Sequence, residues 1–193
     1  RAYLGASRAK REPNWFTGFD ENDNIYLAAL KLKRPLHIIN VALNDVAGQE
    51  LAWQQRKAKS FTFSRLHVGF ENCYRRIREG SYFYGGARGA SLGTAVAVSG
   101  AAVSPNMGYN SSPMVTFLLT LLNARLGWWL GNPGEAGAGT WRLSSPRFSL
   151  KAILTEAFGR TAASRAYVYL SDGGHFDNLG LYEMVRRGCR RIV

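Results

Sequence analysis

The sequence predicts a layered α/β domain in which a mostly parallel sheet carries helices on both faces. Residues 36–43 form a short apolar run rich in β-branched side chains, which is typical of a buried strand in a parallel sheet. Toward the C-terminus, a strand, a Gly-rich turn, a helix and a second strand follow one another within about thirty residues, the pattern of a βαβ unit. Such units build parallel sheets that are covered by helices.

Local patterns predict the other elements. Phe61 and Phe63 alternate with polar residues, as in a half-buried strand. Pro105 ends a helix of small residues, because proline disfavours helical geometry at the residue before it. Ser112 and Pro113 are an N-cap and a first helical residue. In chain order, the expected elements are a strand at 60–66, a loop at 80–93, helices at 94–103 and 114–126, a surface loop at 131–139, an amphipathic helix at 150–158, a strand at 166–170, a turn at 171–177, a helix at 179–187 and a strand from 189.

The composition excludes several classes of protein. The chain has 193 residues, of which 46% are hydrophobic, so it is not a disordered tail. Lys and Arg number 25 against 13 Asp and Glu, and the net charge of +12 favours anionic partners such as lipid headgroups or nucleic acid. Two cysteines, Cys73 and Cys189, form neither a disulfide framework nor a zinc motif, which favours a reducing compartment. No cofactor or metal is expected.

Both ends of the chain have the character of cut ends. The chain begins with Arg1, and residues 191–193 read as the opening of a buried strand. We therefore expect a piece of a longer protein, incomplete at both ends, so that functional residues can lie outside it.

The sharpest chemical feature is the turn that begins at Asp172. An acid directly after an apolar strand lies at the edge of the sheet where open α/β folds place their ligands. Gly173 and Gly174 allow a sharp turn and a close approach of substrate or backbone. The alternative is an N-cap for the next helix, but Asp177 and Asn178 are better placed for that. We therefore expect Asp172 to be functional.

Ser91 lies in a literal Gly-x-Ser-x-Gly pattern, residues 89–93. A nucleophile elbow needs a buried strand before the serine and a helix after it. The helix is expected, but residues 84–88 make a poor strand, so Ser91 is the weaker candidate.

His175 raises two further possibilities, a Ser-His-Asp triad and a metal site with Asp172 and Asp177. A histidine three residues after the acid on one turn has no obvious triad geometry. Three ligands on one loop, without a second cluster elsewhere, make a poor metal site. A histidine that hydrogen-bonds within the turn is the favoured interpretation.

The apolar segment from Met114 to Leu130 is either a core helix or an interfacial lid. Asn123 and Arg125 interrupt it, and a spanning helix needs roughly twenty apolar residues, so it is not expected to cross a membrane. A buried core helix is the favoured interpretation. Arg125, Trp128 and Trp129 would suit headgroup level if the segment lies on a membrane near the active site.

The basic residues fall in three clusters, at 8–11, 75–78 and 186–191, without a recognisable nucleic-acid module. Solvated faces or contacts with anionic lipid explain these clusters as well as nucleic acid does, and nucleic acid is not the expected partner.

Two blocks of the chain resemble patatin-like phospholipases, most closely a group of large bacterial, often membrane-associated members. Residues 167–183 (YVYLSDGGHFDNLGLYE) resemble the Asp-Gly-Gly segment of that family. Residues 91–109 are similar to the Ala-Ser-x-Ala-x-Pro helix and loop that precede it. With the strand at 36–43, the resemblance spans most of the chain.

The resemblance implies a patatin-like α/β fold with a Ser-Asp dyad that hydrolyses phospholipids or other acyl esters. Asp172 matches the family's base, which takes the serine proton without an intervening histidine, and Gly173 and Gly174 match the motif turn. The family's oxyanion loop and serine elbow precede the strand like 36–43, and neither occurs here. Residues 1–193 would then be the C-terminal portion of a catalytic domain, inactive alone, in a cytoplasmic or membrane-associated protein. Ser91 falls in the later helix block instead of the elbow.

Two other classes stay open. One is a catalytically inactive patatin-like module that binds lipid or serves as a scaffold, and the other is a basic nucleic-acid-binding domain. The sequence does not determine which acyl ester is cut, the oligomeric state, or whether the full protein has transmembrane segments.

Overall fold

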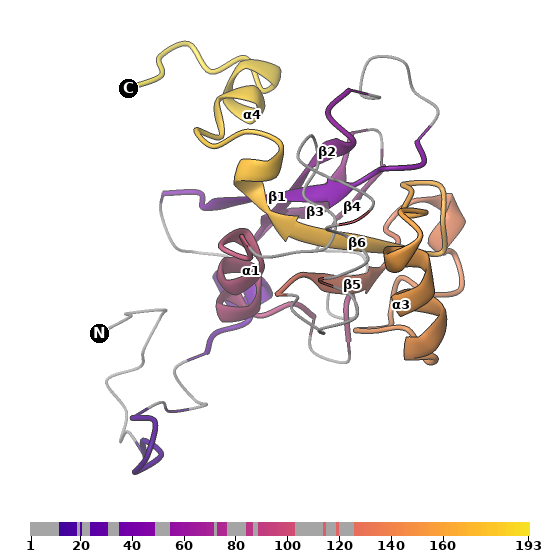
Figure 1. The fold of residues 1–193 in the computed structure, drawn as a ribbon. Coiled ribbons are helices and arrows are strands. Elements are labelled where there is room, and N and C mark those ends of the chain that lie inside the picture. The colour runs from indigo at the N-terminus through magenta and orange to yellow at the C-terminus, as the bar shows by residue number, and fades with distance from the viewer. Residues whose placement is uncertain are drawn as a thin grey trace.

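The fold is built on one six-stranded sheet in which every pair of neighbouring strands is antiparallel. A computed structural model describes residues 12–18, 20, 24–30, 35–48, 55–71, 73–76, 84–86, 89–102, 114, 119 and 126–193. The strands are β1 (Ile38–Asn44), β2 (Ala58–Ser64), β3 (His67–Phe70), β4 (Cys73–Arg76), β5 (Trp128–Gly131) and β6 (Tyr167–Asp172). The helices are α1 (Leu92–Ser99), α3 (Ser149–Ala157) and α4 (Leu181–Arg186), with short 3-10 turns at Leu27–Leu30, Glu135–Gly137 and Gly173–His175. The strand order is β4-β3-β2-β1-β6-β5 (Figure 1).

The antiparallel arrangement corrects the predicted fold class, which was a mostly parallel layered sheet. Two residues, Arg65 and Leu66, separate β2 from β3, and a connection of that length makes an antiparallel hairpin. Ser64 closes this turn, because its hydroxyl accepts hydrogen bonds from the backbone N–H groups of Leu66 and His67. β6 also runs antiparallel to both of its neighbours, β1 and β5, so no βαβ unit forms around it.

The two faces of the sheet differ in chemistry. Val41 and Leu43 of β1 are fully buried on one face, where they join the main apolar core with Ala95 and Val98 of α1. Because side chains alternate along a strand, the residues between them point to the other face. That face is covered by the Gly173–His175 turn and α4, and its buried side chains are mostly polar: Asn44, Ser60, Thr62 and Ser171. Figure 1 shows α1 and α4 on opposite sides of the central strands.

Several predicted elements differ in detail. The strand expected at 60–66 is β2, and it is buried along nearly its whole length instead of on one face. The surface loop expected at 131–139 includes the end of β5, and its residues Asn132 and Gly137 are buried. No strand forms at 189–193, where the side chains are exposed.

The predicted helix at 114–126 lies almost wholly outside the described residues. Trp128 and Trp129, which we expected at its end, belong instead to β5. The Trp128 ring stacks on Phe63 at 6.3 Å between centroids, so these tryptophans are part of the sheet and not of the end of a helix. Among the described residues, no helix is long and apolar enough to cross a membrane.

Candidate functional site

Asp172 is the last residue of β6 and begins the Gly173–His175 turn. Its backbone N–H lies 3.4 Å from the carbonyl oxygen of Ala101, just beyond the end of α1. Its carboxylate Oδ1 accepts a 2.7 Å hydrogen bond from the backbone N–H of Gly174. The other oxygen, Oδ2, accepts no hydrogen bond from the described part of the chain. Asp172 therefore has one oxygen fixed by the turn and one that accepts from none of the described residues.

The two glycines after Asp172 are required by the turn itself. A Cβ on Gly173 would lie 2.5 Å from the backbone carbonyl oxygen of Asn40, which is held inside the sheet. A Cβ on Gly174 would overlap the side-chain amide of Asn178. The close approach that we predicted for a substrate or for backbone is thus made by the chain itself, with Asn40 of β1 beside Gly173 and Asn178, which precedes α4, beside Gly174.

His175 hydrogen-bonds within the turn, as we expected. Its Nδ1 lies 2.9 Å from Ser171 Oγ, and that hydroxyl also accepts a 2.8 Å hydrogen bond from Asn44 Nδ2. Burial lowers the pKa of His175 below its usual 6.5, although the Asp172 charge and a hydrogen bond to the Ala102 backbone favour the protonated ring. In the neutral ring, Ser171 donates to Nδ1 and the proton sits on Nε2.

The bond between His175 and Ser171 does not make a catalytic pair. Ser171 is fully buried between the sheet and the turn, out of reach of a substrate. One ring nitrogen contacts Ser171, but the further hydrogen bond of the ring goes to the Ala102 backbone and not to the Asp172 carboxylate, so the Ser-His-Asp order is absent here. His175 instead links the end of β6, through Ser171, to the backbone of Ala102, which follows α1.

Asp177 caps the N-terminus of α4, a role for which the sequence analysis named Asp177 and Asn178 as candidates. Its Oδ1 accepts a hydrogen bond from Leu179 N–H at 3.1 Å, and its Oδ2 accepts one from Tyr182 N–H at 2.8 Å. Its carbonyl accepts a bond from Asn40 Nδ2 at 3.1 Å, which ties the turn to β1. Both oxygens of Asp177 are thus engaged, in contrast to Asp172.

Glu183 is a buried acid that the sequence analysis missed. Its side chain is 2% exposed and accepts hydrogen bonds from Ser60 at 2.8 Å and from Arg186 at 2.7 Å, with Arg187 at 3.1 Å. Burial alone would raise the pKa of Glu183, but the hydrogen bonds and positive charges of its partners outweigh burial and lower it. The signal that could have found this network is the set of polar residues on one face of the two central strands, at positions 40 and 44 of β1 and 60, 62 and 64 of β2.

Ser91 is not placed near Asp172. Its hydroxyl accepts a hydrogen bond from Thr94 N–H at 3.1 Å and thereby caps the N-terminus of α1. Asp172 contacts Ala101 at the other end of this helix. Ten residues of helix span about 15 Å, so the Ser91 hydroxyl does not reach the Asp172 carboxylate.

Asp172, His175 and Asp177 do not converge as metal ligands. Within the part of the chain that the structure describes, no three His, Cys, Asp or Glu side chains are grouped so that they could hold a metal ion. The oxygens of Asp177 and one oxygen of Asp172 are taken by backbone N–H groups. The arrangement is suited to accepting a proton at Asp172 Oδ2.

Comparisons with known proteins add no assignment. No protein-family model matches the sequence, no curated protein is significantly similar to it, and no solved structure matches the fold. Function is therefore inferred from the residues and their geometry.

Proposed function

We propose that this chain supplies the general base of a serine acyl ester hydrolase, and that the base is Asp172. The observation that carries the proposal is the asymmetry of its carboxylate. Oδ1 is held by the Gly174 N–H group, and Oδ2 accepts no hydrogen bond from the described residues. A carboxylate near its usual pKa is a weak base, so it needs a close and pre-aligned hydrogen bond to the serine that it deprotonates. Fixing one oxygen orients the other for such a bond.

In the proposed reaction, a serine hydroxyl attacks the carbonyl carbon of an acyl ester while its proton passes to Asp172 Oδ2. The tetrahedral intermediate collapses, the proton moves from Asp172 to the leaving alcohol, and the acyl group stays on the serine. Water then attacks the acyl-enzyme while Asp172 again accepts a proton. Asp172 returns that proton to the serine oxygen as the acyl–serine bond breaks, which releases the carboxylic acid and restores both side chains. The serine and the donors for the oxyanion are proposed to come from outside these 193 residues, since Ser91 caps α1 at a distance.

The resemblance of residues 167–183 to the Asp-Gly-Gly segment of patatin-like phospholipases supports a lipid acyl ester as the substrate class. The lowered pKa of His175 supports the role of Asp172 as a base. Burial favours the neutral imidazole, and a neutral ring does not offset the negative charge of the nearby Asp172 carboxylate. The proposal rests on the turn and not on a patatin-like sheet, because the sheet described above is antiparallel throughout.

A second candidate is a lipid-binding or scaffold module without catalytic activity. The Oδ1 bond to Gly174 favours it, because an Asp that accepts from the N–H two residues on is also a common turn-stabilising device. In that case Asp172 stabilises the turn and nothing more.

The two candidates are separated by Asp172→Asn in the longest version of the protein, including any sequence encoded upstream of Arg1. Asparagine keeps the side-chain oxygen that accepts from Gly174 but loses the negative charge. Loss of a general base costs on the order of 100- to 10,000-fold in rate, so ester hydrolysis should fall by that factor with little change in melting temperature.

The matched control is Asp177→Asn, which makes the same change in charge five residues away at a cap with both oxygens engaged. It should leave the rate of hydrolysis unchanged. Near-normal turnover of Asp172→Asn, or equal loss in both variants, contradicts the role of Asp172. Absence of hydrolysis in the unsubstituted full-length protein, across short- and long-chain esters, favours the inactive module.

A further inference from the structure

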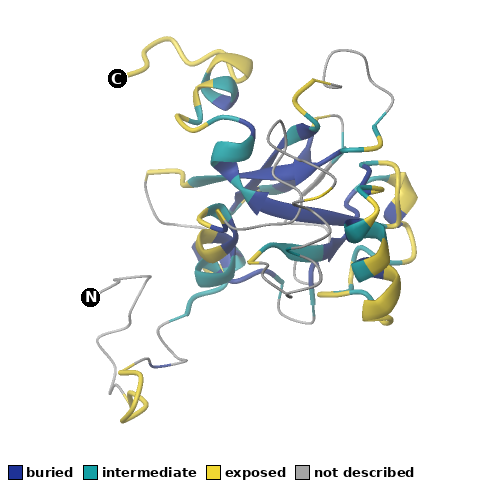
Figure 2. Ribbon diagram, viewed as in Figure 1, coloured by how far each residue is buried: buried dark blue, intermediate teal, exposed yellow. Residues whose placement is uncertain are grey.

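The outer side of α3 carries a ridge of exposed apolar side chains. Leu150, Leu154 and Phe158 are 66%, 46% and 69% exposed, and Phe148, just before the helix, is 79% exposed. The first three are four residues apart and so line one side of the helix. Figure 2 shows α3 exposed along its outer side at the edge of the molecule. Single exposed apolar residues are normal, but four gathered on one short segment mark an interaction surface.

The ridge faces outward because the other side of α3 is anchored. Ala152 and Glu156 are 8% and 0% exposed. Glu156 Oε2 accepts a 3.1 Å hydrogen bond from the indole N–H of Trp129 in β5. The only acid of the helix is thus turned into the protein, and none lies on its exposed side.

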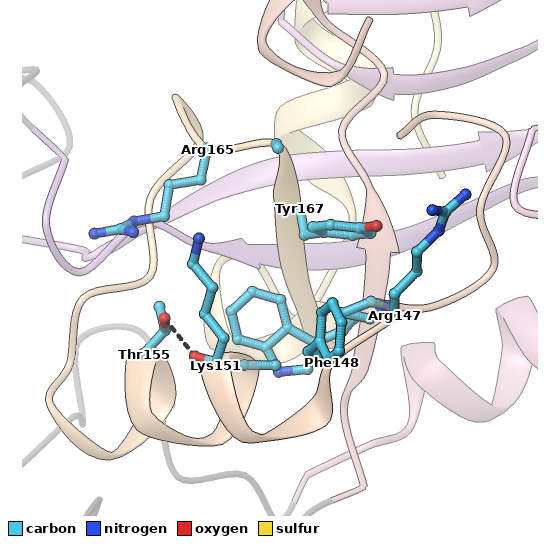
Figure 3. A pocket seen from close by; sticks show the side chains of 10 residues that line it. Arg147, Phe148, Lys151, Thr155, Arg165 and Tyr167 are labelled. Atoms are coloured by element: carbon cyan, nitrogen blue, oxygen red, sulfur yellow. Dashed lines mark hydrogen bonds between the residues drawn. The ribbon is translucent and has the colours of Figure 1, made fainter. Parts of the chain in front are cut away.

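A pocket beside the ridge is surrounded by cations. Its volume is about 360 Å³, and among its lining residues are Trp129, Arg147, Phe148, Lys151, Arg165 and Tyr167. In Figure 3 the Lys151 ammonium group lies between Arg165 and the Tyr167 ring, and the Arg147 guanidinium lies beyond that ring. No aspartate or glutamate lines the pocket. Phe148 belongs to both the ridge and the pocket, and Lys151 of α3 lines the pocket beside Leu150, so the ridge and the pocket form one continuous surface.

We propose that α3 and the adjacent pocket form a contact surface for an anionic lipid bilayer. Apolar side chains beside Lys and Arg are the composition of helices that lie in a membrane interface, with the apolar side among the acyl chains and the cations at the headgroups. Anionic lipids attract such cations, which adds to the burial of the ridge. The pocket gives the headgroups a positively charged recess next to the inserted ridge.

Two other occupants fit the surface less well. In a symmetric dimer the patch would face its own copy and bring Arg147, Lys151 and Arg165 close to the same cations of the partner. A nucleic acid would be attracted by the cations but would leave the four apolar side chains of the ridge in water. A bilayer satisfies both parts of the surface.

This inference does not depend on the catalytic proposal. Tyr167 at the pocket and Asp172 are the two ends of β6, and five residues of strand span about 17 Å. A protein with an inactive Asp172 would still bind the bilayer, so the failure of one proposal does not imply the failure of the other.

Co-sedimentation with phosphatidylcholine vesicles, with and without phosphatidylserine, tests the surface in the full chain. Binding should require phosphatidylserine. Arg147→Gln with Lys151→Gln should weaken it about 20- to 30-fold, since each cation near an anionic surface contributes about fivefold. Leu150→Ser with Leu154→Ser should weaken it about 10- to 30-fold through the lost apolar burial.

Matched controls remove the same groups elsewhere. Arg190→Gln with Arg191→Gln removes two exposed cations, and Leu181→Ser with Val185→Ser removes two exposed apolar side chains from α4. These variants should bind vesicles as the unsubstituted chain does. Circular dichroism melting curves confirm that each variant is folded.

Several results would overturn the inference. These are absence of binding to phosphatidylserine vesicles, equal weakening in the α3 variants and the controls, and binding to pure phosphatidylcholine that the α3 variants retain. Self-association that the ridge variant abolishes, without vesicle binding, assigns the surface to a second copy. Binding to single-stranded RNA but not to vesicles assigns it to nucleic acid.

Discussion

The two ends of β6 place charged residues in opposite ways. At its C-terminal end, polar and charged side chains turn inward and bond to one another, as Glu183 does with Ser60 and Arg186. At its N-terminal end, Arg147, Lys151 and Arg165 surround an apolar pocket, and none forms an ion pair with a carboxylate in the described residues. The polar contacts at the first end stabilise the fold, and the cations at the other end belong to the surface that we propose for an anionic bilayer.

The net charge of +12 includes two kinds of cation, those paired with a carboxylate inside the fold and those gathered at the pocket. Arg186 and Arg187 belong to a basic cluster of the sequence, yet both contact Glu183 and serve the fold. Lys151 and Arg165 stand apart from any basic cluster, yet they are the cations gathered at a pocket. The spacing of charges along the chain therefore does not identify the surface that we propose for an anion. That proposal rests on cations that gather at one apolar pocket with no carboxylate in its lining.

The largest expected effect is on the buried acid. Glu183→Ala leaves the Ser60 hydroxyl without its carboxylate acceptor and Arg186 and Arg187 without their counter-ion. Breaking a buried pair costs 3–5 kcal/mol, and since both arginines reach water in part, we expect a loss of about 2–3 kcal/mol in the free energy of unfolding. Urea titration measures it. Glu135→Ala, at an exposed acid, is the control and should change stability by less than about 0.5 kcal/mol.

The pKa of Glu183 also predicts a pH dependence. Because the pKa is lower in the folded than in the unfolded chain, its contribution is complete above about pH 4.5 and is lost as pH falls through the folded pKa. The difference in the free energy of unfolding between Glu183→Ala and the unsubstituted chain should therefore become smaller as the pH falls. A difference that stays constant down to the acid transition would show that the carboxylate is not what stabilises α4.

The next largest effect is expected at Gly173, where a substitution tests whether the turn requires glycine. In Gly173→Ala the new methyl group would lie 2.5 Å from the Asn40 carbonyl oxygen, so β1 or the turn must move. Such overpacking costs typically 1–3 kcal/mol, and we expect about 2 kcal/mol. Gly139→Ala is the control, since no atom lies within 4 Å of its added Cβ. Equal stability of the two variants would mean that Gly173 is not required by the fold.

Local patterns predicted individual elements better than their arrangement. Residues 36–43, 60–66 and 166–170 were predicted as strands, and these ranges overlap β1, β2 and β6 with ends that differ by one to two residues. β3, β4 and β5 were missed, because they have four residues each and carry little periodicity. The parallel sheet was wrong because the Gly-rich turn after β6 resembles a βαβ connection, while the strand pairing is decided by tertiary contacts such as β6 with β1.

The candidate site was predictable only where one residue carries its own local signal. Asp172 follows an apolar strand and precedes two glycines, and Asp177 stands where a helix cap is expected, so the sequence singles out both. The cap at Asp177 is confirmed, and the role of Asp172 as a base stays a prediction. Glu183 was not found, because its partner Ser60 is 123 residues away in the sequence. The cations around the pocket were missed for a similar reason, since Arg147 and Lys151 come from the α3 region and Arg165 from the segment before β6.

A smaller effect concerns His175. Burial lowers its pKa in the folded chain, so the unfolded chain binds a proton more readily and stability falls as pH drops below about 6.5. His175→Gln should remove this part of the pH dependence, leaving a flatter stability profile between pH 6.5 and pH 5. His37→Gln, at an exposed histidine, is the control. An unchanged slope in His175→Gln would show that the ring is not buried in its neutral form.

The smallest expected effect on stability is at the exposed ridge of α3. Leu154 is 46% exposed on the α3 ridge, so Leu154→Ser removes little apolar burial from the folded chain, and we expect a change of less than about 0.5 kcal/mol in the free energy of unfolding. Leu130→Ala, at a fully buried position in β5, should instead cost about 2–5 kcal/mol. Chemical denaturation of the two variants beside the unsubstituted chain measures both values. If Leu154→Ser lowers the free energy of unfolding as much as Leu130→Ala does, Leu154 belongs to the core and is not a free surface residue. If it costs almost nothing, the fold does not require an apolar side chain there, which is what the proposed bilayer contact predicts.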